Sequence, residues 1–159
     1  MKVKAVMMRD VQVCVPEDNL AAAAMIMWRN DCGIVPVMRE DCEVLGVITD
    51  RDICMAVATK DKAASQITVG EVYSGKLYVC NSHDNVHDAL KTMKTEKVRR
   101  LPVISTNGTL EGMLSMNDVV RVAEPGNGRD GAEVSYEDVV KTLQAISEPR
   151  GRSGRHAPS

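Results

Sequence analysis

The apolar residues in the first half of the chain change their spacing several times. Residues 11–15 alternate apolar and polar side chains, which is typical of a short strand. A stretch rich in Ala and Met follows at 19–30; it begins after Pro16 and ends at an Asp-Cys-Gly sequence, and this pattern predicts a helix. Two apolar runs around an acidic turn, at 34–38 and 44–48, predict paired strands, and a second helix is expected after Thr49.

The second half of the chain repeats the first. A shift of 66 residues, without a gap, aligns valines, prolines, glycines and helix-capping residues of the two halves. The aligned pairs include Val3 with Val69, Cys14 with Cys80, Pro36 with Pro102, Gly46 with Gly112, Thr49 with Ser115 and Asp52 with Asp118. The same order of strand, helix, strand, strand and helix is therefore predicted for 77–80, 85–96, 101–105, 110–114 and from Met116 onward.

One such unit is too small to bury the face of its own sheet, so two units must pack on each other. The predicted fold class is α/β (α+β), with two strand-helix-strand-strand-helix motifs at 3–60 and 69–123 packed as a pseudo-two-fold intramolecular pair. Residues 124–134 are rich in Gly and predict a linker, and 135–148 predict an amphipathic C-terminal helix. The tail at 149–159 is predicted to be disordered.

Composition and charge narrow the classes of function. The net charge is -2 and only 3% of the residues are aromatic. Binding of single-stranded nucleic acid combines positive charge with stacked rings, so a nucleic-acid partner is not expected. No apolar run reaches the roughly 18 residues of a membrane helix, so no membrane association is expected. The five cysteines form no Cys-x-x-Cys pair, and with no signal peptide apparent we expect a reduced, cytoplasmic protein.

Each half carries a Gly-containing strand followed by Thr/Ser-x-x-Asp at the start of a helix. The copies run from Gly46 to Asp52 and from Gly112 to Asp118. The N-terminus of a helix offers backbone N–H groups to a phosphate, and an Asp one turn later can accept hydrogen bonds from ribose hydroxyls. The same pattern is also a capping box, by which a helix satisfies its own first turn. A single copy favours capping, whereas two equivalent copies favour a ribose phosphate site.

The pattern Gly-apolar-x-Thr/Ser-x-x-Asp, after an apolar-Pro-Val strand, is that of the cystathionine β-synthase (CBS) motif, and both halves match it. Over residues 3–123 the chain resembles a CBS-motif pair, or Bateman module, of the small stand-alone type. The resemblance implies a regulatory or sensor module without catalytic activity. Its ligand would be AMP, ADP or ATP, with NAD or S-adenosylmethionine as alternatives, bound between the motifs, and no cofactor is implied.

The resemblance also implies roles for individual residues. Asp52 and Asp118 take the positions that bind ribose hydroxyls, and Thr49 and Ser115 take those that contact ribose or phosphate. The segments that enclose the adenine in this family correspond to Val13, Val15, Ile34 and Val35 in the first half, and to Val79, Asn81, Arg100 and Leu101 in the second.

Phosphates also need cations, and three arginines are candidates: Arg51, Arg99 and Arg100. The alternative is that they are ordinary surface charges. Arg51 aligns with Asn117, and the other two align with Gly33 and Ile34. We therefore expect two sites that differ in their affinity for phosphate.

The main alternative is a structural or protein-interaction module that binds no ligand and acts through its helix faces. CBS pairs usually dimerise through their helices, so a homodimer is expected, and a regulated protein partner is an open alternative. No activated nucleophile or acid–base pair is apparent, so an enzyme is not expected. His83 and His87 are four residues apart, but the polar start of a helix explains them better than a metal site does.

Overall fold

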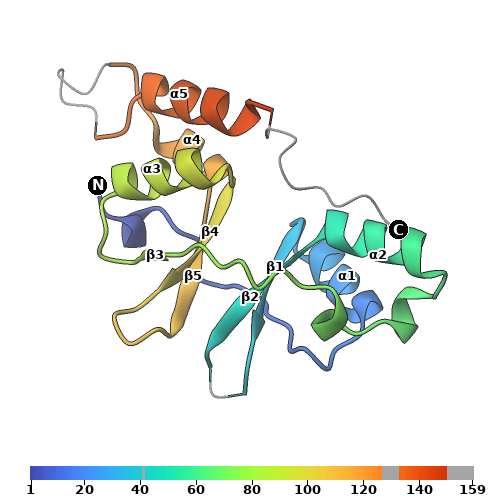
Figure 1. Ribbon diagram of the computed structural model, residues 1–159. Coiled ribbons are helices and arrows are strands. Elements are labelled where there is room, and N and C mark those ends of the chain that lie inside the picture. Colours follow the sequence, from blue (N-terminus) through green and yellow to red (C-terminus); the bar gives the residue numbers. More distant parts are fainter. Residues whose placement is uncertain (41, 127–132, 150–159) are drawn as a thin grey trace.

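The computed structural model describes residues 1–40, 42–126 and 133–149. Figure 1 shows two lobes, each made of a small sheet with helices packed against it. The first lobe contains α1 (Leu20–Arg29), β1 (Ile34–Met38), β2 (Val44–Thr49) and α2 (Asp50–Lys60). The second contains β3 (Cys80–Asn81), α3 (Val86–Glu96), β4 (Arg100–Ile104), β5 (Leu110–Ser115), α4 (Met116–Val122) and α5 (Tyr136–Ser147). The predicted mixed α/β fold class is confirmed.

The two hairpins have the same register. In the β1–β2 hairpin, Ile34 lies opposite Thr49 and Val37 lies opposite Gly46. In the β4–β5 hairpin, the residues 66 positions later make the same pairs, and both hairpins have an irregularity at the same place. The hairpin ends also meet, through a bridge between Glu43 and Thr109. The repeat seen in the sequence is therefore a repeat in backbone pairing.

The strand predicted at 11–15 is wrong except for one position. Only Cys14 forms a bridge, parallel to Val37, whereas its counterpart in the second lobe belongs to β3. The two lobes differ because the second lobe has one further hydrogen bond between these strands. Ser82 donates its backbone N–H to the carbonyl of Ile104 at 3.3 Å. The residue equivalent to Ser82 is Pro16, which has no N–H to donate, so the ladder in the first lobe ends early.

Each lobe is completed by the segment at the start of the other motif. Val3 is buried in the core of the second lobe. Figure 1 accordingly shows the N-terminus of the chain near α3. Its counterpart Val69 is buried in the core of the first lobe. The two segments are held alike: Val3 donates to the carbonyl of Asp84, and Val69 donates to that of Asp18. The two motifs are therefore exchanged at their starts, which ties the lobes together.

These exchanged segments explain the glycine of each motif. The segment after Val69 bridges β2 at Ser74, and the segment after Val3 bridges β5 at Met8. A Cβ atom on Gly46 would lie 2.1 Å from the carbonyl oxygen of Ser74, and one on Gly112 would lie 2.3 Å from that of Met8. A backbone that approaches this closely leaves room only for hydrogen. Gly46 and Gly112 are thus required because the exchanged segment crosses each strand at the glycine.

Helix α5 packs on the second lobe. It begins after Ser135, as predicted, and buries Val139 and Thr142 against α3 and its neighbours (Figure 1). The end of the predicted linker is not a free connection, because Val134 is buried in the core of the second lobe. Residues 127–132 of that linker, and the predicted tail from residue 150, lie outside the described residues. No helix in the described part of the chain has the length and apolar character to cross a membrane.

Candidate functional site

Both copies of Thr/Ser-x-x-Asp form complete capping boxes. In the first, the Thr49 hydroxyl and backbone N–H donate to Asp52 Oδ2 at 2.7 and 2.9 Å, and the Asp52 N–H donates to Thr49 Oγ1 at 3.2 Å. In the second, Ser115 and Asp118 make the same three bonds at 2.6, 2.8 and 3.3 Å. The capping interpretation is therefore confirmed, but it uses only one oxygen of each carboxylate. The other oxygen, Oδ1, decides what else each copy can bind.

The Oδ1 atoms of the two copies have different surroundings. In the second copy, Arg121 Nη2 donates to Asp118 Oδ1 at 2.5 Å, and Asp118 is only 5% exposed. In the first copy, Met55 takes the place of Arg121. Among the described residues, nothing forms a hydrogen bond or an ion pair with Asp52 Oδ1. One carboxylate is thus already paired, and the other keeps a free acceptor.

The structure places two predicted arginines beside the second copy. Arg100 lies opposite Ser115 in the hairpin, and the carbonyl of Arg99 accepts the N–H of Met116 at 3.0 Å. At the equivalent places of the first copy lie Ile34, opposite Thr49, and Gly33. No polar partner of the Arg51, Arg99 or Arg100 side chains is found in the part of the chain that the structure describes. These guanidinium groups are therefore available to an anion.

Sequence reasoning missed two charged residues of the site. Asp50 lies against Gly33, where an added Cβ would be 2.7 Å from its Oδ2 atom, and its counterpart Met116 is buried and apolar. Arg121 follows Asp118 by three residues on a helix, a spacing that places two side chains on one face and that the sequence already contained. With these two residues, the first copy is surrounded mainly by negative charge and the second mainly by positive charge.

The residues expected around adenine are only partly accessible. Val35 and Leu101 are fully buried in the two cores, so they can offer a ligand only their backbone. The remaining ones are exposed or half-buried: Val13, Val15, Ile34, Val79, Asn81 and Arg100. Asn81 has a buried Oδ1 atom without a hydrogen-bond partner among the described residues. A buried acceptor of this kind costs stability until a donor reaches it.

A hollow in the surface lies between α1 and α2 and touches the first copy at its edge. Gly33 and Asp50 contribute to its wall, together with apolar residues and two thiols: Ala24, Met27, Trp28, Cys32, Ile53 and Cys54. A second hollow is lined by Pro16, Glu17, Arg39, Glu40 and Leu45. Neither Asp52 nor Asp118 lines these two hollows, so the carboxylates of the motifs lie outside both.

The two buried cysteines are inert thiols. Burial raises the pKa of Cys14 to about 12, and the nearby Asp18 adds to this shift. Burial likewise raises the pKa of Cys80 to about 12, with a contribution from Asp84. Because the thiolate is the reactive form, neither side chain is a nucleophile at neutral pH.

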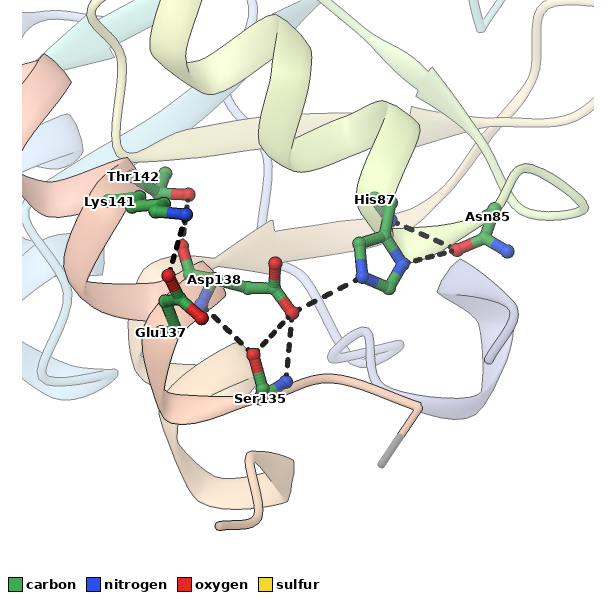
Figure 2. A network of polar contacts seen from close by, with 7 residues as sticks. All are labelled: Asn85, His87, Ser135, Glu137, Asp138, Lys141 and Thr142. Atoms are coloured by element: carbon green, nitrogen blue, oxygen red, sulfur yellow. Dashed lines mark hydrogen bonds and ion pairs between the residues drawn. The ribbon is translucent and has the colours of Figure 1, made fainter. Parts of the chain in front are cut away.

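His87 takes part in fastening α5 to α3, as Figure 2 shows. Its Nε2 atom lies 3.3 Å from Asp138 Oδ2, which also accepts hydrogen bonds from the hydroxyl and the N–H of Ser135. Burial alone would raise the pKa of Asp138, but the bonds from Ser135 and the neighbouring His87 lower it below its ordinary value. Among the described residues, no three His, Cys, Asp or Glu side chains are grouped as a metal site.

Two curated relatives are similar to the chain over most of its length. The uncharacterized protein YlbB of Bacillus subtilis (strain 168) is 32% identical over 136 residues, which cover 84% of this chain and 89% of that protein. An uncharacterized protein of Methanopyrus kandleri is 29% identical over 114 residues, and there the match spans 72% of this chain but only 58% of the relative.

Solved structures with the same fold hold different ligands. Hypoxic response protein 1, solved with two coordinated zinc ions, has a TM-score of 0.71 at 27% identity and covers 78% of this chain and all of its own. A CBS-domain protein of Pyrobaculum aerophilum, complexed with AMP, has a TM-score of 0.67 at 22% identity, over 75% of this chain and 90% of that one. A CBS-domain pair in complex with 5′-methylthioadenosine and S-adenosyl-L-methionine has a TM-score of 0.69 at 20% identity. The match covers 76% of this chain and 94% of that one.

The family model for the CBS domain matches the chain twice. The matches cover residues 3–59 and 69–124, nearly the same ranges as the two predicted motifs. Together with the common hairpin register and the two capping boxes, they show that this chain belongs to the CBS-domain family and contains a CBS-domain pair.

Proposed function

We propose that this CBS-domain pair is a cytoplasmic regulatory module that binds an adenosine nucleotide at its motifs and catalyses no reaction. The observation that carries the proposal is the doubled capping box, which fixes each Asp carboxylate but commits only one of its oxygens to the helix. A ribose presents two adjacent hydroxyl donors, which suit a carboxylate held in this way. Similar proteins that hold AMP or S-adenosyl-L-methionine support the same class of ligand.

The nucleotide class follows from the charges near the motifs. Arg51, Arg99 and Arg100 have guanidinium groups without polar partners among the described residues, and guanidinium binds phosphate oxygens well. AMP, ADP and ATP therefore remain the first ligands to test, followed by NAD and S-adenosylmethionine. The free thiols of all five cysteines agree with a reducing compartment.

The test is calorimetric titration of the protein with AMP. Asp52→Ala and Asp118→Ala should weaken binding at their own motifs, and the double variant should bind no nucleotide. The chain supplies a matched control, because Ser135 and Asp138 form the same capping box on α5, outside the motifs. Asp138→Ala should lose a similar capping contribution and bind AMP normally. Unchanged affinity in the Asp52→Ala, Asp118→Ala double variant would refute the proposed sites.

The absence of catalysis is also testable. The two buried cysteines are held as thiols, so they offer no nucleophile that could open a phosphoanhydride or ester bond. Purified protein incubated with ATP, ADP or AMP should return the nucleotide unchanged, as followed by chromatography. Turnover that disappears in Asp52→Ala would contradict this part of the proposal.

A second candidate function, interaction through the helix faces, is favoured by an exposed apolar surface on the first lobe. This surface consists of Met25, Trp28, Met55 and Val57 on α1 and α2, and Trp28 is 83% exposed. The equivalent helices of the second lobe are covered by α5, an amphipathic helix of the same chain (Figure 1). The contact of α3 and α4 with a further helix supports the proposal that α1 and α2 also form a contact with a helix. We propose that a second copy of the chain covers it, giving a homodimer.

Light scattering coupled to size exclusion measures this directly. The wild type should elute as a dimer, and Trp28→Lys should shift the mass to that of a monomer, since a charge at the centre of an apolar interface is costly. Tyr136→Lys, at an exposed position on the outer face of α5, is the control and should remain dimeric. A monomeric wild type would exclude the second copy and leave the surface to a different protein.

A further inference from the structure

We infer that the two motifs select different adenosyl ligands: the second takes a phosphate-bearing one, the first takes an uncharged or cationic one, and Arg121 makes the difference. This inference rests on the proposed nucleotide function. It goes further because it assigns a charge class to each copy and gives a role to Arg121, which lies outside the Thr/Ser-x-x-Asp pattern.

The first step is that Arg121 occupies the acceptor that a ribose needs. Asp118 Oδ2 already accepts two bonds from Ser115, so Oδ1 is the oxygen that remains, and Arg121 donates to it at 2.5 Å. Asp118 is almost fully buried, whereas the Arg121 side chain is 70% exposed. A ligand that uses Oδ1 must therefore displace a guanidinium group that is free to swing into solvent.

The second step is that a phosphate compensates for this displacement. Ribose hydroxyls are neutral donors, and they replace a charge-assisted bond with weaker ones. A ligand phosphate offers the released Arg121 a new anionic partner, and Arg99 and Arg100 lie next to the same motif through β4. Adenosine lacks that group, so it should bind the second copy poorly, while AMP should bind it well.

The third step is that the first copy has the opposite character. Asp52 Oδ1 has no partner among the described residues, and the residue equivalent to Arg121 is Met55, whose side chain cannot compete for it. Asp50 adds a second carboxylate against Gly33, and Arg51 is the single arginine nearby in the sequence. Adenosine can therefore bind without displacing anything, and a positive group on the ligand would be favoured over a phosphate.

A reciprocal exchange tests the inference, with adenosine and AMP as the two probes. In calorimetry the wild type should bind one adenosine per chain, lost in Asp52→Ala. Arg121→Met, which copies the first lobe, should allow a second adenosine to bind at Asp118 and should weaken AMP there by roughly tenfold. Met55→Arg, which copies the second lobe, should weaken adenosine at Asp52 by roughly tenfold. Circular dichroism melts establish that each variant is folded.

The outcomes separate the inference from the function on which it rests. If neither probe binds the wild type or any variant, the proposed nucleotide function is wrong and the inference falls with it. If the wild type binds but adenosine already fills two sites per chain, the inference alone is overturned. The same holds if Arg121→Met leaves the number of adenosine sites and the affinity for AMP unchanged. Opposite effects of the two exchanges are the result that we expect, and loss of folding does not produce opposite effects.

Discussion

The two lobes contain the same hairpin in the same register, yet they differ in the strand, the helices and the charged side chains that surround it. In the second lobe, β3 adds a third strand, α5 covers the helices, and Arg121 pairs with the carboxylate of the motif. In the first lobe, Pro16 shortens the strand ladder, the helices expose Trp28, and the carboxylate keeps a free oxygen. The repeat thus preserved the backbone of the hairpin and its capping box and varied the side chains around them.

The lobes are nevertheless not independent, because each is completed by the segment at the start of the other motif. Family matches and sequence repeats divide the chain at about residue 60, whereas the cores divide it differently: Val3 and Met7 belong with the second lobe, and Ile67 and Val69 belong with the first. If a nucleotide binds as proposed, a shift of one lobe also pulls on a segment that enters the other. The exchange would then be a physical route by which the two proposed sites influence each other.

The largest expected effect concerns this exchange. Met7→Ala and Ile67→Ala each remove a buried side chain and should lower the free energy of unfolding by about 2–5 kcal/mol. Hydrogen exchange should locate the damage in the lobe that the side chain enters, so Met7→Ala should reduce amide protection of α3, and Ile67→Ala that of α1. Met8→Ala, at an exposed site of the same segment as Met7, is the control. Loss of protection in the first lobe on Met7→Ala, or in the second lobe on Ile67→Ala, would contradict the exchange.

The sequence predicted the hairpins and helices because their signals are local. Caps such as Asn19 and Ser135, and the apolar alternation of each strand, act over a few residues. The exchange of the starting segments was not predictable, because an isolated valine such as Val3 carries no information about which core receives it. The strand at 11–15 failed for a local reason that was present but overlooked, since Pro16 cannot donate to the ladder.

In the candidate site, too, the local features were predictable from the sequence and the long-range contacts were not. Its carboxylates and hydroxyls lie in the expected capping geometry, and the expected inequality of the copies has a structural basis in the placement of Arg99 and Arg100. The spacing of Asp118 and Arg121 allowed their pairing to be predicted, whereas the burial of Asp118 depends on how α4 packs in the folded lobe. The position of Asp50 depends on the contact with Gly33, a residue 17 positions earlier that only folding brings near.

A smaller effect is expected at the two glycines of the motifs. Gly46→Ala and Gly112→Ala would each place a methyl group within 2.1–2.3 Å of a backbone carbonyl oxygen, which cannot rotate away. Each should lower the free energy of unfolding by about 1–3 kcal/mol, measured by urea denaturation. Gly75→Ala, with no atom within 4 Å of the new methyl group, should change stability little. A clear difference between Gly46→Ala and Gly112→Ala would show that the two crossings are not equivalent.

The smallest effect concerns the pH dependence of the contact that holds α5 on the second lobe. The pKa of Asp138 is lowered in the folded protein, so its ionised form stabilises the attachment of α5 (Figure 2). That contribution is complete above the ordinary carboxyl pKa of about 4, and it is lost as the pH falls through the lowered value. The difference in free energy of unfolding between wild type and Asp138→Asn should therefore be constant near neutral pH and shrink below about pH 4. Asp88→Asn, an exposed change on α3, should show no such trend, and a difference between wild type and Asp138→Asn that grows on acidification would contradict the role of this carboxylate.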